Sequence, residues 1–150
     1  MQLSLHSDYA LRVLMALATA DRQLSVDDIA RRYGISRNHL AKVAQRLHAE
    51  GLVETFRGRG GGMRLARPAD EIVVGDVVRR FENLDSFVGC FAAGPGCVVS
   101  GPCALKPALA GAVEAFLAHL DGYRLSDLTP DPAAFLSRLG GAPTRHAATV

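Results

Sequence analysis

The sequence lacks any apolar run that approaches the ~20 residues needed for a membrane-spanning helix. It also lacks the features of a secretory signal, because no basic segment precedes the first apolar stretch and four charged residues interrupt that stretch. No internal repeat is present. We therefore expect a cytoplasmic protein with no membrane partner.

Residue patterns of a catalytic centre are missing as well. No Ser/His/Asp or Cys/His set has a spacing that suits nucleophilic catalysis. The adjacent carboxylates Asp27 and Asp28 are interpreted as charges in the first turn of a helix, where the helix dipole favours them. An enzyme is not expected.

Cysteine is absent from the whole chain except for one segment, residues 90–103, which reads CFAAGPGCVVSGPC. Its glycines and prolines break helices and strands alike, so the segment is predicted to be a loop. Cys90, Cys97 and Cys103 are an odd number, which cannot close a set of disulfides. In a reducing compartment, clustered cysteines more often bind metal or sense redox state.

The spacing of these thiols narrows the choice of group. Thiolates bind soft metals and iron–sulfur clusters, whereas Mg²⁺ and Ca²⁺ prefer oxygen. The gaps of six and five residues lack the close pair typical of structural zinc sites, and no nearby histidine completes a tetrahedral set. An iron–sulfur cluster is favoured, although it usually takes four protein ligands. A thiol redox switch, a zinc site and a loop without metal are the alternatives.

Charge is divided unevenly along a chain whose composition, 49% hydrophobic and 21% charged, is that of a folded globular protein. Residues 1–68 carry eleven Lys and Arg against six Asp and Glu, a net charge of +5, whereas residues 69–150 carry a net charge of −3. The basic part indicates a polyanionic partner. We expect residues 1–68 and residues 69–150 to have different functions.

The periodicity of the first part predicts a winged helix-turn-helix, so the fold is expected to be mainly α with a small β-hairpin wing. Ser25 and Asp28 form a capping-box pattern at the start of the second helix, and the spacing of Leu40, Val43, Ala44 and Leu47 predicts the buried face of the third. A turn containing Gly34 separates these two helices, and a glycine-rich basic tip separates two short strands. A long apolar-striped helix follows the cysteines. The expected helices span 7–20 (capped by Ser7), 25–32, 36–50, 75–84 and 104–122, with strands at 52–56 and 63–66 and short helical pieces at 126–128 and 131–139.

Three regions are predicted from these elements. Residues 1–68 form the DNA-binding domain, residues 69–128 hold the cysteine loop and a dimerisation helix, and residues 129–150 form a C-terminal extension that is partly disordered.

The third predicted helix carries polar residues that suit the major groove of DNA, because Arg pairs with guanine while Asn and Gln pair with adenine. Arg57 and Arg59 at the glycine-rich tip suit a minor groove, and Arg64 and Arg67 suit the flanking backbone. Lys42 and Arg46 are expected to contact phosphates. The predicted contacts with double-stranded DNA are Ser36, Arg37, Asn38, His39, Lys42, Gln45, Arg57, Arg59 and Arg64.

Several strings then resemble one known family: SDYALR at 7–12, YGISRNH at 33–39, RGRGGGMRL at 57–65 and GDVV at 75–78, together with the three cysteines. The chain is similar over residues 1–128 to the nitric-oxide-sensing NsrR branch of the Rrf family of iron–sulfur winged-helix regulators. The resemblance implies a cytoplasmic homodimer that represses transcription. It also implies a 4Fe-4S rather than a 2Fe-2S cluster.

The resemblance implies roles for individual residues too. Cys90, Cys97 and Cys103 match the cluster ligands, and Asp8 matches an oxygen ligand supplied by the partner subunit. Loss of the Asp8 bond when nitric oxide arrives is expected to release the DNA-binding domains from an inverted-repeat operator. The related IscR type, a regulator of iron–sulfur status, has a histidine where this chain has Lys106, so that alternative is less favoured. The metal-free thiol-switch repressor is the other alternative.

Overall fold

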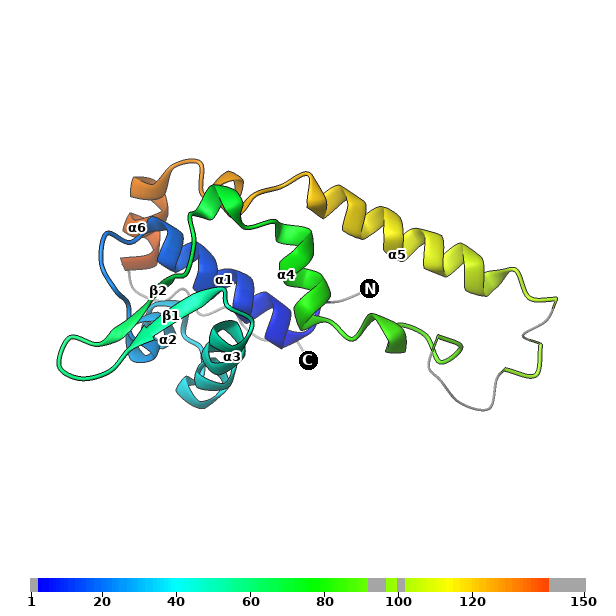
Figure 1. Ribbon diagram of the computed structural model, residues 1–150, viewed down its shortest axis with the longest axis horizontal. Helices are drawn as coiled ribbons and strands as arrows, with labels where there is room; N and C mark the ends of the chain where they lie inside the picture. Colours follow the sequence, from blue (N-terminus) through cyan, green and yellow to red (C-terminus); the bar gives the residue numbers. More distant parts are fainter. Residues whose placement is uncertain (1–2, 92–96, 100–101, 141–150) are drawn as a thin grey trace.

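The computed structural model describes residues 3–91, 97–99 and 102–140. It is mainly helical with one two-stranded antiparallel hairpin, as predicted (Figure 1). None of the described helices has both the length and the hydropathy to span a membrane. The α-helices and strands are α1 (Leu5–Thr19), α2 (Val26–Tyr33), α3 (Arg37–Ala49), β1 (Val53–Phe56), β2 (Gly62–Leu65), α4 (Val74–Phe81), α5 (Leu105–Asp121) and α6 (Pro132–Gly140), with short 3-10 turns η1 (Ala69–Glu71), η2 (Leu84–Ser86) and η3 (Leu125–Leu128).

The N-terminus of α1 lies two residues earlier than predicted. Ser4, not Ser7, is the N-cap, and its hydroxyl accepts a hydrogen bond from the backbone N–H of Ser7 at 3.2 Å. Ser7 itself is fully buried. Both serines are good capping residues, and a serine three positions upstream is the one that satisfies an N–H of the first turn.

Helix α2 begins and ends as the sequence predicts. Ser25 caps it in a reciprocal capping box, in which Ser25 Oγ accepts from the Asp28 N–H at 3.0 Å and Asp28 Oδ2 accepts from the Ser25 N–H at 3.2 Å. Gly34 ends α2 with φ of 66°, a left-handed conformation that glycine adopts without steric cost. This turn directs the chain into α3.

Helix α3 packs one face into the core through Leu40, Val43, Ala44 and Leu47, the four residues predicted. The hairpin then pairs Val53 with Leu65 and Phe56 with Gly62, so residues 57–61 form its tip. A backbone bridge joins Leu24, just before α2, to Met63 of β2. The hairpin is thereby attached to the helix-turn-helix as a wing.

One large hydrophobic cluster holds the DNA-binding body together. Helix α1 lies at its centre and packs against α3, α4 and α6 (Figure 1). Leu125 and Leu139, from η3 and α6, are buried in this same cluster. The predicted short C-terminal helices therefore exist, and they pack on the winged helix. Residues 141–150, where disorder was predicted, lie outside the described residues.

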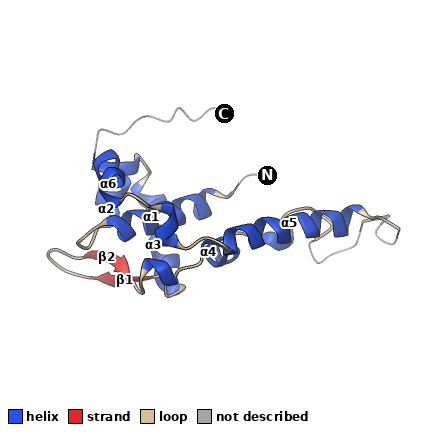
Figure 2. Cartoon of the chain, turned by 90° about the horizontal axis from the view of Figure 1, so that it is seen from above, coloured by secondary structure: helices blue, strands red, loops and turns tan. Residues whose placement is uncertain are grey.

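A second, smaller cluster joins α4 to α5 through Val78, Val113 and Leu117. Beyond this contact α5 extends away from the body, as both views show (Figures 1 and 2). Half-buried Phe87 and Phe91, which precede and follow Cys90, pack against the same cluster. The start of the cysteine segment is thus anchored where α4 meets α5.

The capping box gives α2 a pH-dependent contribution to stability. Hydrogen bonds from Ser25 lower the pKa of Asp28 below 3.8, so the ionised carboxylate stabilises the fold above that pH and loses the effect as the pH falls through the lowered pKa. Asp28→Asn should reduce the free energy of unfolding by roughly 0.5–1 kcal/mol at pH 7. Urea denaturation should show this difference shrinking towards pH 3. An undiminished difference at pH 3, or an equal loss in the control Asp21→Asn, contradicts the prediction.

Candidate DNA-binding surface and cysteine segment

The polar face of α3 is open to solvent because the opposite face is buried in the core. All six residues predicted to contact DNA from this helix and its N-cap are exposed, and Ser36 makes no capping hydrogen bond with its side chain. The structure therefore leaves all six side chains accessible to solvent, which a recognition helix requires. The six are Ser36, Arg37, Asn38, His39, Lys42 and Gln45.

The wing carries its arginines in two different ways. Arg57 and Arg59 are exposed at the tip, where Gly58 and Gly60 have φ of 95° and 78°. Arg64 lies on β2 opposite Glu54, to which it forms an ion pair of 2.8 Å across the hairpin. Arg57 and Arg59 thus lie on an exposed glycine-rich turn, whereas Arg64 is paired with Glu54 on the strands of the wing.

Arg46 has an intramolecular role that the sequence did not suggest. Its guanidinium lies 4.7 Å from the ring centroid of Phe81 and donates a hydrogen bond to the carbonyl oxygen of Arg80. Both partners are at the C-terminal end of α4. The guanidinium is stabilised by the cation–π contact with the ring and by the negative end of the helix dipole of α4. The structure thus turns Arg46 toward α4, whereas the sequence predicted a phosphate contact.

A second contact links the same two helix ends in the opposite direction. Arg80 of α4 donates to the backbone carbonyl of Glu50, the C-cap of α3, at 3.0 Å, and its guanidinium lies 3.4 Å from the Glu50 carboxylate. Arg79 forms two hydrogen bonds of 2.6 Å to Asp121 at the end of α5. This pairing lowers the pKa of Asp121. Neighbouring arginines of α4 therefore contact the recognition helix and the long helix.

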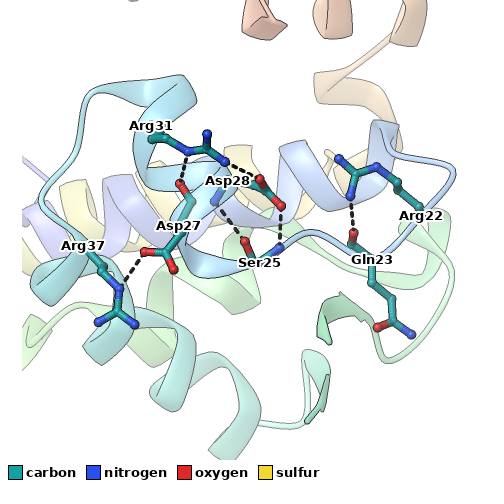
Figure 3. A network of polar contacts seen from close by, with 7 residues as sticks. All are labelled: Arg22, Gln23, Ser25, Asp27, Asp28, Arg31 and Arg37. Atoms are coloured by element: carbon teal, nitrogen blue, oxygen red, sulfur yellow. Dashed lines mark hydrogen bonds and ion pairs between the residues drawn. The ribbon is translucent and has the colours of Figure 1, made fainter. Parts of the chain in front are cut away.

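The two carboxylates of α2 have different partners, which the sequence interpretation missed (Figure 3). Asp28 completes the capping box and pairs with Arg31 at 2.7 Å. Asp27 instead accepts a hydrogen bond of 2.6 Å from Nε of Arg37, the first residue of α3. Adjacent acidic residues at a helix start look equivalent in a sequence, and only the crossing of α2 and α3 distinguishes them.

The three cysteines are free thiols, with Cys90 and Cys103 half-buried and Cys97 exposed. Among the described residues, no three His, Cys, Asp or Glu side chains lie close enough together to hold a metal ion. Residues 92–96 and 100–101, between these cysteines, lie outside the description. The fit of a metal centre is therefore judged on donor chemistry. Three thiols that can ionise are suitable ligands for soft metals.

Asp8 lies in the first turn of α1, away from any such set of donors in the described part of its own chain. Its carboxylate pairs with Arg12 at 3.0 Å, one helical turn later. The Arg12 guanidinium lies 5.7 Å from the ring centroid of Tyr33, whose hydroxyl donates to the Arg12 carbonyl oxygen at 3.1 Å. Burial raises the pKa of Tyr33 to about 12, so this donor stays neutral and protonated. Asp8 is thus linked through Arg12 to the last residue of α2.

Comparisons with known proteins agree with this geometry. The family model described as "Rrf2: Iron-dependent Transcriptional regulator" matches residues 3–131. The chain is 47% identical over 142 residues to the HTH-type transcriptional regulator NsrR of Geobacillus kaustophilus, covering 93% of this chain and 97% of that protein.

Solved structures show the same fold. Staphylococcus aureus CymR has 29% identity and a TM-score of 0.66, covering 83% of this chain and 95% of that one. T. potens IscR has 26% identity and a TM-score of 0.69, covering 90% of each chain. The exposed recognition helix, the basic wing and these matches lead to one conclusion. The chain belongs to the Rrf2 family of iron-dependent transcriptional regulators and is a DNA-binding member of the NsrR type, not an enzyme.

Proposed function

We propose that the chain is a nitric-oxide-sensing repressor, which as a homodimer loaded with an iron–sulfur cluster binds an inverted-repeat operator and leaves it when nitric oxide is present. The observation that carries the proposal is the position of the cysteine segment. Cys90 follows Phe81 by nine residues, and Phe81 lies under Arg46 of the recognition helix. A rearrangement around the cysteines therefore has a short path to the helix that reads DNA.

The donor set suits the proposed cofactor. Cys90, Cys97 and Cys103 would hold the cluster through their thiolates, and Asp8 from the partner subunit would supply an oxygen ligand. Three cysteines and a carboxylate make four ligands, the usual number for such clusters, and we propose the 4Fe-4S form. When bound, the cluster supplies iron that reacts with nitric oxide. The residues described below transmit its state.

Asp8 is suited to report on the cysteine segment because it has two possible partners. In the described chain its carboxylate pairs with Arg12, which in turn contacts Tyr33 of α2. As a ligand, the Asp8 carboxylate would leave Arg12, and on release it would pair with Arg12 again. Asp8, Arg12 and Tyr33 would then have two arrangements, one with and one without the Asp8–Arg12 ion pair. Coupling between two sites requires a two-state element of this kind.

The long helix supports the proposed homodimer. Eleven of the 17 residues of α5 are Ala, Val, Leu or Phe, yet only Val113 and Leu117 are buried, and Leu105 is 60% exposed. A helix with this composition gains stability by covering its apolar surface. A second copy of α5, crossing the first, would do so and would set the spacing of the two recognition helices. About 3 kcal/mol of coupling between cluster and spacing would change operator affinity by about two orders of magnitude.

A metal-free thiol switch is the second candidate, favoured by the free state of all three cysteines and the exposure of Cys97. Two thiols would lose two electrons and two protons to an oxidant such as peroxide, forming one disulfide that a dithiol reduces again.

The deciding experiment is an anaerobic absorption spectrum with iron and sulfide analysis of the purified chain, before and after addition of nitric oxide. A brown protein absorbing at about 400 nm that bleaches with nitric oxide and then releases operator DNA is expected, because three thiolates are suitable cluster ligands. Cys97→Ser should lower the iron content. A colourless protein that takes up no iron after anaerobic reconstitution, and whose DNA binding follows peroxide and dithiol, would instead establish the thiol switch.

Removing the Asp8 carboxylate should separate cluster loading from DNA release. Asp8→Ala should keep most of its iron but bind the operator weakly both with and without nitric oxide, because the bond that ties the DNA-binding domain to the cluster is absent. Fluorescence anisotropy of a labelled operator measures the affinity in both states. Asp21→Ala is the matched control, because it removes an exposed carboxylate that is not one of the three side chains of the proposed coupling. An unchanged nitric oxide response in Asp8→Ala, or an equal loss in Asp21→Ala, rules out the ligand role.

The wing arginines should contribute affinity without much sequence preference. Arg57→Ala and Arg59→Ala are each expected to weaken binding to all duplexes several-fold and to reduce the salt dependence of log Kd by about one unit, because each removes one exposed cation at the tip. Titrations at several salt concentrations measure this. Arg138→Ala, on α6, is the control and should leave the slope unchanged. Identical slopes in all variants would mean that the tip does not contact DNA phosphates.

A further inference from the structure

The first residue of the recognition helix is held by a carboxylate from the preceding helix. Arg37 Nε donates to Asp27 Oδ1 at 2.6 Å (Figure 3). Both side chains remain exposed, at 65% and 57% of their surface. The contact therefore does not bury either group, and its effect is on the orientation of the guanidinium.

The geometry of this contact leaves the recognition edge of Arg37 available. A guanidinium has five N–H donors in a rigid plane, and the contact uses the single donor on Nε. The two terminal nitrogens make no hydrogen bond to any described residue. These terminal nitrogens form the pair of parallel donors that matches O6 and N7 of guanine. A fixed Nε holds the plane of that pair and reduces the side-chain entropy lost on binding.

Asp27 is not occupied by another task. The capping box and the ion pair with Arg31 are both made by Asp28, so the reciprocal cap of α2 does not use the Asp27 side chain. A carboxylate at a surface that faces DNA phosphates lowers affinity for any duplex, since like charges repel. An acidic side chain at that place is useful when it improves discrimination more than it weakens binding.

We propose that Asp27 is a specificity-determining positioning residue, which orients Arg37 to read one guanine in each half-site of the operator. The proposal rests on the proposed function, because it requires that α3 reads bases. Asp27 itself touches no base, and it acts through Arg37. Its removal should relax one position of the operator and leave the rest of the recognised sequence intact.

The test is a binding selection from a pool of random-sequence duplexes with the full-length chain, followed by titration of every single-base variant of the selected site. The wild type should select a G·C pair at one position of each half-site. Arg37→Ala should lose this preference, and Asp27→Ala should reduce it by about tenfold. The double variant should resemble Arg37→Ala alone, and Asp27→Asn should be intermediate, because the amide oxygen still accepts a hydrogen bond from Nε.

Charge and stability are controlled separately. Asp21→Ala removes one exposed negative charge from the nearby α1–α2 connection, so it should shift affinity for all sequences without changing the G·C preference. Thermal unfolding of each variant identifies any loss of the fold, and Asp27→Asn keeps the shape of the side chain. A uniform gain in affinity on Asp27→Ala with the preference retained would show that Asp27 is only a repulsive charge and would overturn the proposal.

Two further outcomes distinguish this proposal from the proposed function. If Arg37→Ala selects the same site as the wild type, Arg37 reads no base, and the positioning role of Asp27 is wrong while operator binding stands. If the wild type selects no preferred sequence, the repressor function fails, and the role of Asp27 fails with it.

Discussion

Helix α4 is the element on which the rest of the structure depends, because its consecutive residues Val77 and Val78 are buried in two different hydrophobic clusters. Val77 packs with the winged helix, and Val78 packs with α5. A helix of eight residues can contribute to both clusters because neighbouring side chains point about 100° apart. Helix α4 therefore holds the winged helix and α5 in one fixed arrangement.

Electrostatic contacts reinforce the same joint. Arg79 contacts the end of α5, Arg80 contacts the end of α3, and Arg46 returns from α3 to the ring of Phe81. These contacts are at the surface, so each contributes little to stability by itself. Their importance is geometric, since they connect the recognition helix to the helix that leads into the cysteine segment. The proposed coupling thus depends on how the elements are joined, whereas the core supplies the stability.

Local signals in the sequence were sufficient for most elements. Ser25 with Asp28 and the glycine at position 34 predicted the ends of α2, and the spacing of Leu40, Val43 and Leu47 predicted the buried face of α3. The N-cap of α1 was misplaced because Ser4 and Ser7 are chemically alike. The packing of α6 was not predicted, since the helical period identifies an apolar face such as that of Leu139 but not the surface that covers it.

The sequence by itself determined which groups are available for the proposed chemistry: three thiols in one Gly- and Pro-rich segment, a basic winged helix and a long apolar helix follow from residue types and spacing alone. The tertiary structure decided the partners. Arg46 turns to Phe81 and Asp27 turns to Arg37, contacts that depend on how α3 lies against α4 and α2. The sequence around an exposed charged residue does not identify the side chain that it contacts. Only the packing of the apolar faces beneath brings Arg46 over Phe81 and Arg37 to Asp27, which is why these contacts could not be read from the chain.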